Sequence, residues 1–266
     1  MLCNLHTHTT FCDGKNTPEE LVLYAIDKGF NSLGFSGHAY TPFDSSYCIN
    51  DTESYLAEIN RLKEKYKGKI EIYLGIEEDA AAPFKREPFD YVIGSSHYFL
   101  IGDKYFAIDQ SAECFKKCLD AFDKDILKLA NSYYSRFTSY LEKYKPDIIG
   151  HFDLILKYEE VSPSGFFESE EYFSLADKYA KEASKLNLLF EVNTGAMARG
   201  YRTKPYPHER ILHTLKKSGA RIILSSDCHE KHKLDFEFAE TKKLLKDIGF
   251  EHAYSLSEGN FKKYLL

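Results

Sequence analysis

The chain has 266 residues, enough for one large α/β domain. It carries 35 basic and 41 acidic residues, and this net charge of −6 argues against the basic surface that duplex nucleic acid requires. The sequence has neither a run of apolar residues that would span a membrane nor a secretory signal. We therefore expect a cytoplasmic protein without a membrane or nucleic-acid partner, whose six cysteines are reduced.

Apolar runs alternate with amphipathic stretches along the chain. The runs are typical of parallel strands covered on both faces, and they predict strands at residues 2–6, 32–36, 70–76, 91–95, 148–151, 188–193 and 221–226. Helices are predicted between them, the first from the capping sequence that starts at Thr17 to Gly29. The other helices are predicted at residues 51–66, 169–186, 207–218 and 234–248.

One connection is much longer than a simple crossover between strands. Residues 98–147 are predicted to form a helical insertion, with one long helix or two successive helices within residues 111–144. No linker or repeat divides the chain, so a single domain is predicted over residues 1–266. Seven strands alternating with helices leave two architectures, an open doubly wound sheet or a closed barrel. Residues 253–256 either add an eighth strand or lie outside the barrel.

The first predicted strand carries a histidine pair. His6 and His8 are two residues apart, so their side chains point to the same face of an extended strand. Asp13 follows in the next loop and adds a carboxylate. Two imidazoles and a carboxylate suit a divalent metal ion, although such a pair also occurs on ordinary exposed strands. The positions of the other histidines decide between the two interpretations.

Six of the ten histidines lie at the C-terminal end of a predicted strand, and three acidic residues accompany them. Unrelated histidines would not gather at the same end of successive strands. These nine candidate ligands suit two or three zinc, iron or manganese ions better than magnesium, which prefers oxygen ligands. They are His6, His8, Asp13, His38, Glu77, His97, His151, Asp227 and His229. Ligands from many strand ends are typical of a barrel.

The motifs that hold these residues follow one another in a distinctive order: His6-x-His8 with Asp13, Gly37-His38, Gly75-x-Glu77, Ser95-x-His97, Gly150-His151-x-Asp153 and Ser226-Asp227-x-His229. Over essentially the whole chain they resemble the PHP (polymerase and histidinol phosphatase) superfamily. The length and the insertion are most similar to its histidinol-phosphate phosphatase branch. The resemblance implies a distorted (β/α)7 TIM-like barrel with a trinuclear metal centre. Asp13 stands where many relatives have histidine.

The resemblance also implies how the nine candidate ligands are divided among the three metal ions. Their spacing in the sequence identifies the candidates but not this division. The first ion is assigned to His6, His8, Glu77 and Asp227. The second is assigned to Glu77, His97 and His151, with Glu77 as the bridge, and the third to Asp13, His38 and His229.

The activity implied by the resemblance is hydrolysis of L-histidinol phosphate to L-histidinol and phosphate, in histidine biosynthesis. Two divalent ions can convert a bridging water into a hydroxide that attacks phosphorus in line. Candidates for the general acid are Asp227, His229 and Asp153. Candidates for binding the substrate phosphate are Arg199, then Arg202, and Lys157, which supplies charge without the bidentate fork of arginine.

Three alternatives remain open from the sequence. The same metals would serve a PHP-type phosphatase or phosphodiesterase acting on another small phosphate ester or a nucleotide. A non-catalytic metal-binding protein on a decayed barrel would be expected to lack some ligands, and all nine are present. A metal-dependent amidohydrolase would be expected to carry a bridging lysine at a strand end, where this chain has none.

Overall fold

The computed structural model describes all 266 residues. One sheet contains nine strands in the order β1-β2-β3-β4-β7-β8-β9-β10-β11, and every pair is parallel except the last. Its strands are β1 (Cys3–Asn4), β2 (Ser32–Phe35), β3 (Glu71–Asp79), β4 (Tyr91–Ser95), β7 (Ile148–Ile149), β8 (Leu189–Asn193), β9 (Arg221–Ser225), β10 (His252–Ser257) and β11 (Asn260–Leu265).

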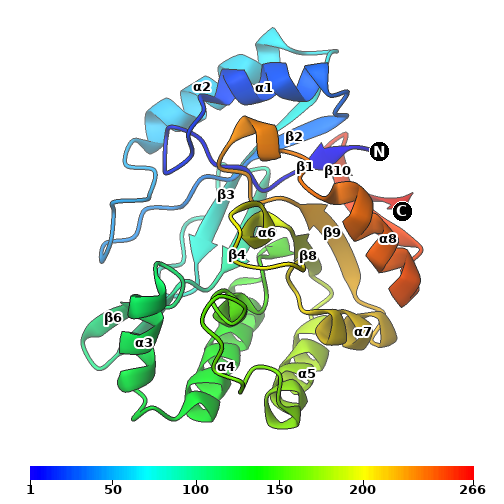
Figure 1. The fold of residues 1–266 in the computed structure, drawn as a ribbon. Coiled ribbons are helices and arrows are strands. Elements are labelled where there is room, and N and C mark those ends of the chain that lie inside the picture. Colours follow the sequence, from blue (N-terminus) through cyan, green and yellow to red (C-terminus); the bar gives the residue numbers. More distant parts are fainter.

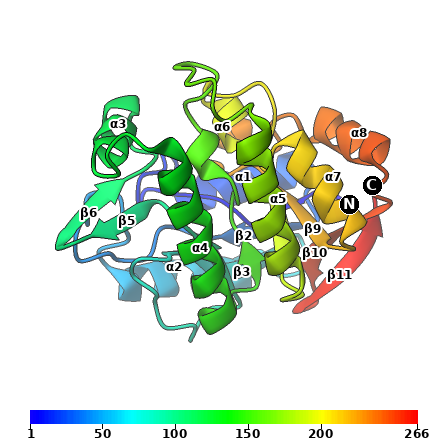
Figure 2. The ribbon, with the colours of Figure 1, turned by 90° about the horizontal axis from the view of Figure 1, so that it is seen from below.

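Helices cover the outside of this curled sheet (Figures 1 and 2). They are α1 (Pro18–Asp27), α2 (Thr52–Lys65), α4 (Ile126–Tyr144), α5 (Glu170–Ser184), α7 (Glu209–Lys217) and α8 (Phe238–Ile248). The short helix α6 (Gly195–Ala198) lies at one end of the barrel, and α3 (Ala112–Asp120) lies in the long insertion. Two short 3-10 turns, η1 (Leu154–Leu156) and η2 (Lys231–Lys233), complete the fold. The predicted capping box of α1 is confirmed, because Thr17 and Glu20 each accept a hydrogen bond from the other's backbone N–H. No helix combines the length and apolar character needed to cross a bilayer.

The sheet curls until its first and seventh parallel strands meet. The chain just after β1 forms a parallel bridge with the chain just after β9, at Thr7 and Cys228. Two backbone hydrogen bonds make this contact, from His8 N to Cys228 O (2.8 Å) and from Cys228 N to His6 O (3.0 Å). The predicted distorted barrel is therefore confirmed. Strand β10 extends the sheet beyond β9 as an eighth parallel strand and then turns back into β11.

A small apolar cluster fills the interior of the barrel. Its members come from strands around the wall and are Leu5, Tyr73, Tyr91, Ile93, Ile148, Leu189, Ile223 and Leu256. The Tyr91 hydroxyl donates to the Leu5 carbonyl oxygen at 2.5 Å. A Cβ at Gly34 or Gly75 would lie 2.3 or 2.2 Å from the Tyr91 side chain, so the neighbouring strands must carry glycine there. Two larger clusters pack the outer face of the sheet against the helices, one beneath α1 and α2 and the other beneath α4, α5, α7 and α8.

The predicted strands and insertion differ from the structure in detail. Strand β1 ends at Asn4, so His6 and His8 follow it, whereas β3 continues past Ile76 and contains Glu77. Pairing with β4 extends β3, because Glu77 and Asp79 still lie opposite Ile93 and Ser95. The insertion begins with a hairpin that was not predicted, β5 (Tyr98–Ile101) and β6 (Lys104–Ala107), before the two successive helices α3 and α4.

Candidate metal centre

All nine predicted ligands gather at one mouth of the barrel. Glu77 projects from β3, and the others lie in the segments that follow β1, β2, β4, β7 and β9. The local fold explains this, because the C-terminal ends of parallel strands meet at the same rim. At the rim, a parallel bridge between His38 and Glu77 draws the segment after β2 against β3.

The group assigned to the first ion is compact. The His6 Nε2 and His8 Nε2 atoms lie 3.2 and 3.6 Å from Glu77 Oε2, and 3.6 and 3.2 Å from Asp227 Oδ1. Both Nε2 atoms and Glu77 Oε2 are buried without a hydrogen bond. Burial of unpartnered polar atoms is costly, and a divalent cation among them would remove that cost. The residues therefore fit a metal ion.

Glu77 also faces the group assigned to the second ion. Its Oε1 atom lies 3.1 Å from His151 Nε2 and 3.5 Å from His97 Nε2. The Ser95 hydroxyl donates to the same oxygen at 2.6 Å. With one oxygen toward each group, the Glu77 carboxylate is oriented as a bridge.

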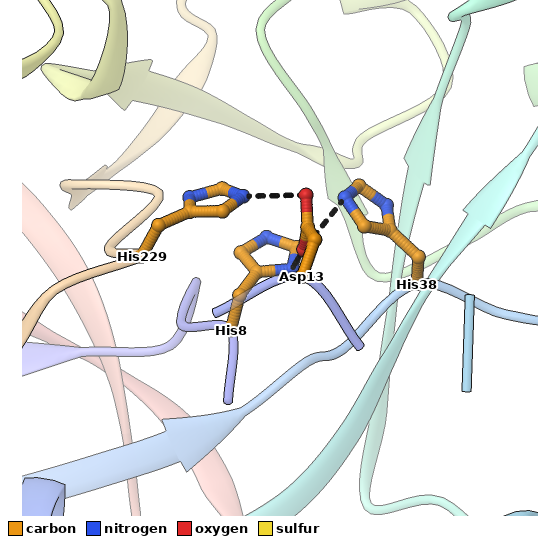
Figure 3. A group of neighbouring side chains, drawn as sticks. All are labelled: His8, Asp13, His38 and His229. Carbon is orange, nitrogen blue, oxygen red and sulfur yellow. Dashed lines mark ion pairs between the residues drawn. The ribbon is translucent and has the colours of Figure 1, made fainter. Parts of the chain in front are cut away.

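The group assigned to the third ion surrounds Asp13 (Figure 3). Asp13 Oδ2 lies 3.2 Å from His229 Nε2, and Asp13 Oδ1 lies 3.7 Å from His38 Nε2. His8 joins this group as well, because its Nδ1 lies 3.6 Å from Asp13 Oδ1. His38 likewise faces two ways, with its Nδ1 2.9 Å from Glu77 Oε2. The groups are thus more interconnected than the predicted division.

Two buried carboxylates that the sequence analysis did not propose orient the imidazoles. Glu191 Oε1 lies 2.5 Å from His6 Nδ1, and Asp79 Oδ2 lies 3.2 Å from His97 Nδ1. Such outer partners set the tautomer and ring orientation of a metal-binding histidine. The sequence signal of Glu191 is a carboxylate in an otherwise apolar strand, which is costly unless it is paired, whereas Asp79 follows two other acidic residues and carries no such signal. Glu191 also accepts a hydrogen bond from the His151 backbone N–H at 2.8 Å.

Burial and mutual charge determine the protonation of these groups. Burial, and then the imidazoles of His229 and His38, lower the pKa of His8 to about 3, so it is neutral and able to bind a cation. Burial alone would raise the pKa of Asp227, but Arg199 and then His6 hold it well below its ordinary value. Asp227 is therefore ionised, which suits a ligand and not a proton donor.

The centre lines a cavity of about 290 Å³. Arg199 also lines this cavity, and its Nη2 donates to Asp227 Oδ2 at 2.8 Å. Asp227 therefore directs one carboxylate oxygen to the histidines and the other to Arg199. Lys157 lines the cavity too, but its ammonium contacts Asp109, with Nζ 3.0 Å from Oδ2.

The structure does not bring Asp153 and Arg202 to the cavity lining. Asp153 is fully buried, and its Oδ2 accepts a hydrogen bond from His208 N at 2.8 Å. Arg202 is also buried, with its guanidinium 4.8 Å from the centre of the Tyr206 ring. Asp153 immediately precedes η1, and its side chain lies in the protein interior. The roles predicted for these two residues are not supported by their positions.

Comparison with known proteins identifies relatives over most of the chain. The family model described as "PHP domain" matches residues 4–195. A Schizosaccharomyces pombe protein named "Probable histidinol-phosphatase" is 28% identical, covering 96% of this chain and 89% of that protein. A Bacillus subtilis histidinol-phosphatase is 27% identical, covering 85% of this chain and 92% of that protein.

Solved structures show the same fold. Histidinol phosphate phosphatase from Lactococcus lactis, complexed with zinc, L-histidinol and phosphate, superposes with a TM-score of 0.74 at 21% identity, covering 98% of each chain. The chain therefore belongs to the PHP domain family, within the branch that contains the histidinol-phosphatases.

Proposed function

We propose that the protein is a metal-dependent phosphomonoesterase that hydrolyses L-histidinol phosphate to L-histidinol and phosphate. One observation carries the chemistry: buried ligand atoms of His6, His8 and Glu77 converge without hydrogen-bond partners beside a cavity of small-molecule size. The substrate follows from the relatives, because proteins named histidinol-phosphatase align with 85–96% of the chain.

The donor set supports binding of divalent cations, and we propose two or three zinc, iron or manganese ions. Imidazole nitrogens predominate among the nine candidate ligands, and they favour these borderline ions over magnesium. Such ions, when bound, supply Lewis acidity to the phosphoryl group and generate a nucleophile from water at neutral pH. The chain's own part is to hold them in fixed geometry, with Glu77 between two groups and Glu191 behind His6.

Arg199 is the proposed phosphate-binding residue. It lines the cavity, and the contact with Asp227 holds its guanidinium beside the ligand cluster. A planar guanidinium can bind two phosphoryl oxygens at once, so Arg199 would orient the phosphoryl group. Among the predicted proton donors, Asp153 does not line the cavity and Asp227 is ionised, whereas His229 lines the cavity and is an imidazole. It therefore remains the candidate for protonating the departing alcohol.

The proposal is tested by steady-state assay of the purified protein with a panel of phosphomonoesters and nucleotides, together with metal analysis of the same preparation. We expect the highest kcat/KM for L-histidinol phosphate, loss of activity after chelation, and recovery with zinc, iron or manganese. Metal-dependent activity confined to other esters would disprove L-histidinol phosphate as the substrate but would still support metal-dependent hydrolysis of phosphate esters. An intact, metal-loaded protein without phosphatase activity would disprove both.

A further inference from the structure

The part of the cavity that holds no predicted metal ligand has a distinct chemistry. Besides the ligands and Arg199, the lining residues are Ser46, Tyr47, Tyr98, Asp109, Gln110, Leu154 and Lys157. Three carboxylates line the cavity, and Asp13 and Asp227 belong to the predicted ligand groups. Asp109 is the third. It lies in the insertion, just after β6, and belongs to none of the predicted ligand groups.

Contacts within the protein fix the position of Asp109 and leave one of its carboxylate oxygens without a partner. Lys157 Nζ contacts both the Asp109 carbonyl oxygen (2.7 Å) and Oδ2 (3.0 Å), and the Tyr158 hydroxyl donates to the same carbonyl oxygen at 2.6 Å. The adjacent Ile108 N–H donates to the His97 carbonyl at 2.8 Å, which keeps this segment beside a predicted ligand. The other carboxylate oxygen, Oδ1, makes no hydrogen bond within the protein.

A carboxylate in this position does not favour binding of the phosphate half of a substrate. Arg199 and the bound cations would attract the phosphoryl group, whereas Asp109 would repel it. A carboxylate of this kind suits a positively charged group on the alcohol half, because a charge-assisted hydrogen bond to Oδ1 would complete its coordination. The rings of Tyr47 and Tyr98 line the same cavity, and aromatic faces attract cations.

We infer that Asp109 is a specificity-determining residue that binds the ammonium group of the alcohol half of the substrate. The inference rests on the proposed function for the identity of that alcohol, L-histidinol, which carries a primary ammonium. Lys157 then acts as a positioning residue: it holds Oδ2 and leaves Oδ1 for the substrate. This interpretation replaces the prediction that Lys157 itself binds the phosphate.

The test uses Asp109→Asn, which keeps the shape of the side chain and removes its charge. The measured quantity is the ratio of kcat/KM for L-histidinol phosphate to kcat/KM for the same ester without its amino group. We expect the substitution to lower this ratio by about 10- to 100-fold. Asp103→Asn is the matched control, because Asp103 is an exposed residue in the turn of the same hairpin, and it should leave the ratio unchanged.

A second measurement does not depend on turnover. Calorimetric titration with L-histidinol should show binding to the metal-loaded wild type and to Asp103→Asn, and binding weakened by about 10-fold or more in Asp109→Asn. Equal metal content and melting temperature in the three proteins establish that folding is intact. A ratio and an L-histidinol affinity that both equal the wild-type values would overturn the role of Asp109.

Failure of the proposed function gives a different result. In that case the wild type itself would not hydrolyse L-histidinol phosphate. The ratio is then measured with phosphoethanolamine and ethyl phosphate, which lacks only the amino group. A decrease of this ratio in Asp109→Asn supports recognition of a cationic alcohol, and an unchanged ratio refutes it.

Discussion

Replacement of Glu77 by glutamine tests the centre most directly. The carboxylate faces five of the six candidate histidine ligands: Oε2 lies 2.9–3.6 Å from nitrogens of His38, His6 and His8, and Oε1 lies 3.1 and 3.5 Å from His151 and His97. Glutamine keeps the size of the side chain but removes its charge and one of its two acceptor oxygens. Both the first and the second ligand group would therefore lose their shared anionic donor.

The magnitude follows from the number of groups that Glu77 serves. Removal of an outer partner of a metal ligand costs about 10- to 100-fold in metal affinity or activity. Glu77 is a direct ligand candidate shared by two groups, so we expect metal affinity to fall by at least about 100-fold, or about 2.7 kcal/mol. Turnover should decrease by at least about 1,000-fold, which corresponds to about 4 kcal/mol of lost transition-state stabilisation.

The assay combines metal content by elemental analysis with steady-state turnover of the phosphate ester. Glu78→Gln is the matched control, because Glu78 is the next residue of β3 and is also buried. Its carboxylate accepts hydrogen bonds from the Tyr140 hydroxyl and the Phe84 backbone N–H, away from the histidines. Glu78→Gln should retain metal and activity. Full metal content and turnover within about 3-fold of wild type in Glu77→Gln would refute the bridging assignment.

Substitutions at three further positions test other parts of the structure. Glu191→Gln weakens the 2.5 Å contact with His6 Nδ1 and should lower metal affinity by about 10- to 100-fold; an unchanged affinity in a metal titration would contradict its orienting role. Arg199→Ala should raise KM for the phosphate ester by about 10-fold with a smaller effect on kcat, and Arg199→Lys should recover only part of this loss; wild-type kinetics in Arg199→Ala would exclude it from the site. Gly75→Ala places a methyl group 2.2 Å from the Tyr91 ring and should lower the free energy of unfolding by about 2–3 kcal/mol, as measured by denaturant titration; an unchanged midpoint would show that the interior can repack.

The ligand pool could be predicted because it depends on local features of the chain. Apolar runs identify parallel strands, and such strands place their C-terminal ends at one rim of the sheet. His97 and His151, which follow β4 and β7, are therefore brought together by the regular fold. The same reasoning predicted two or more metal ions, because nine histidine and carboxylate ligands exceed what one ion binds.

The outer residues of the site could not be predicted with the same success. Glu191 stands out only as a carboxylate in an apolar strand and Asp79 does not stand out at all, and only the structure places them beside the second nitrogens of His6 and His97. Asp153 lies two residues from a predicted ligand, but the turn into η1 directs it away from the cavity. Arg202 is three residues from Arg199 and packs on Tyr206 instead.

The sequence by itself therefore determined the first seven parallel strands of the sheet, the rim at which they end and the residues that surround the candidate metal centre. These follow from side-chain periodicity and from hydrophobic burial within short segments. The tertiary structure decided which oxygen of Glu77 faces which histidine, how the segments after β1 and β9 close the barrel, and that Asp109 of the insertion lines the cavity. These features arise from contacts between residues far apart in the chain, whose geometry depends on how all the elements pack together.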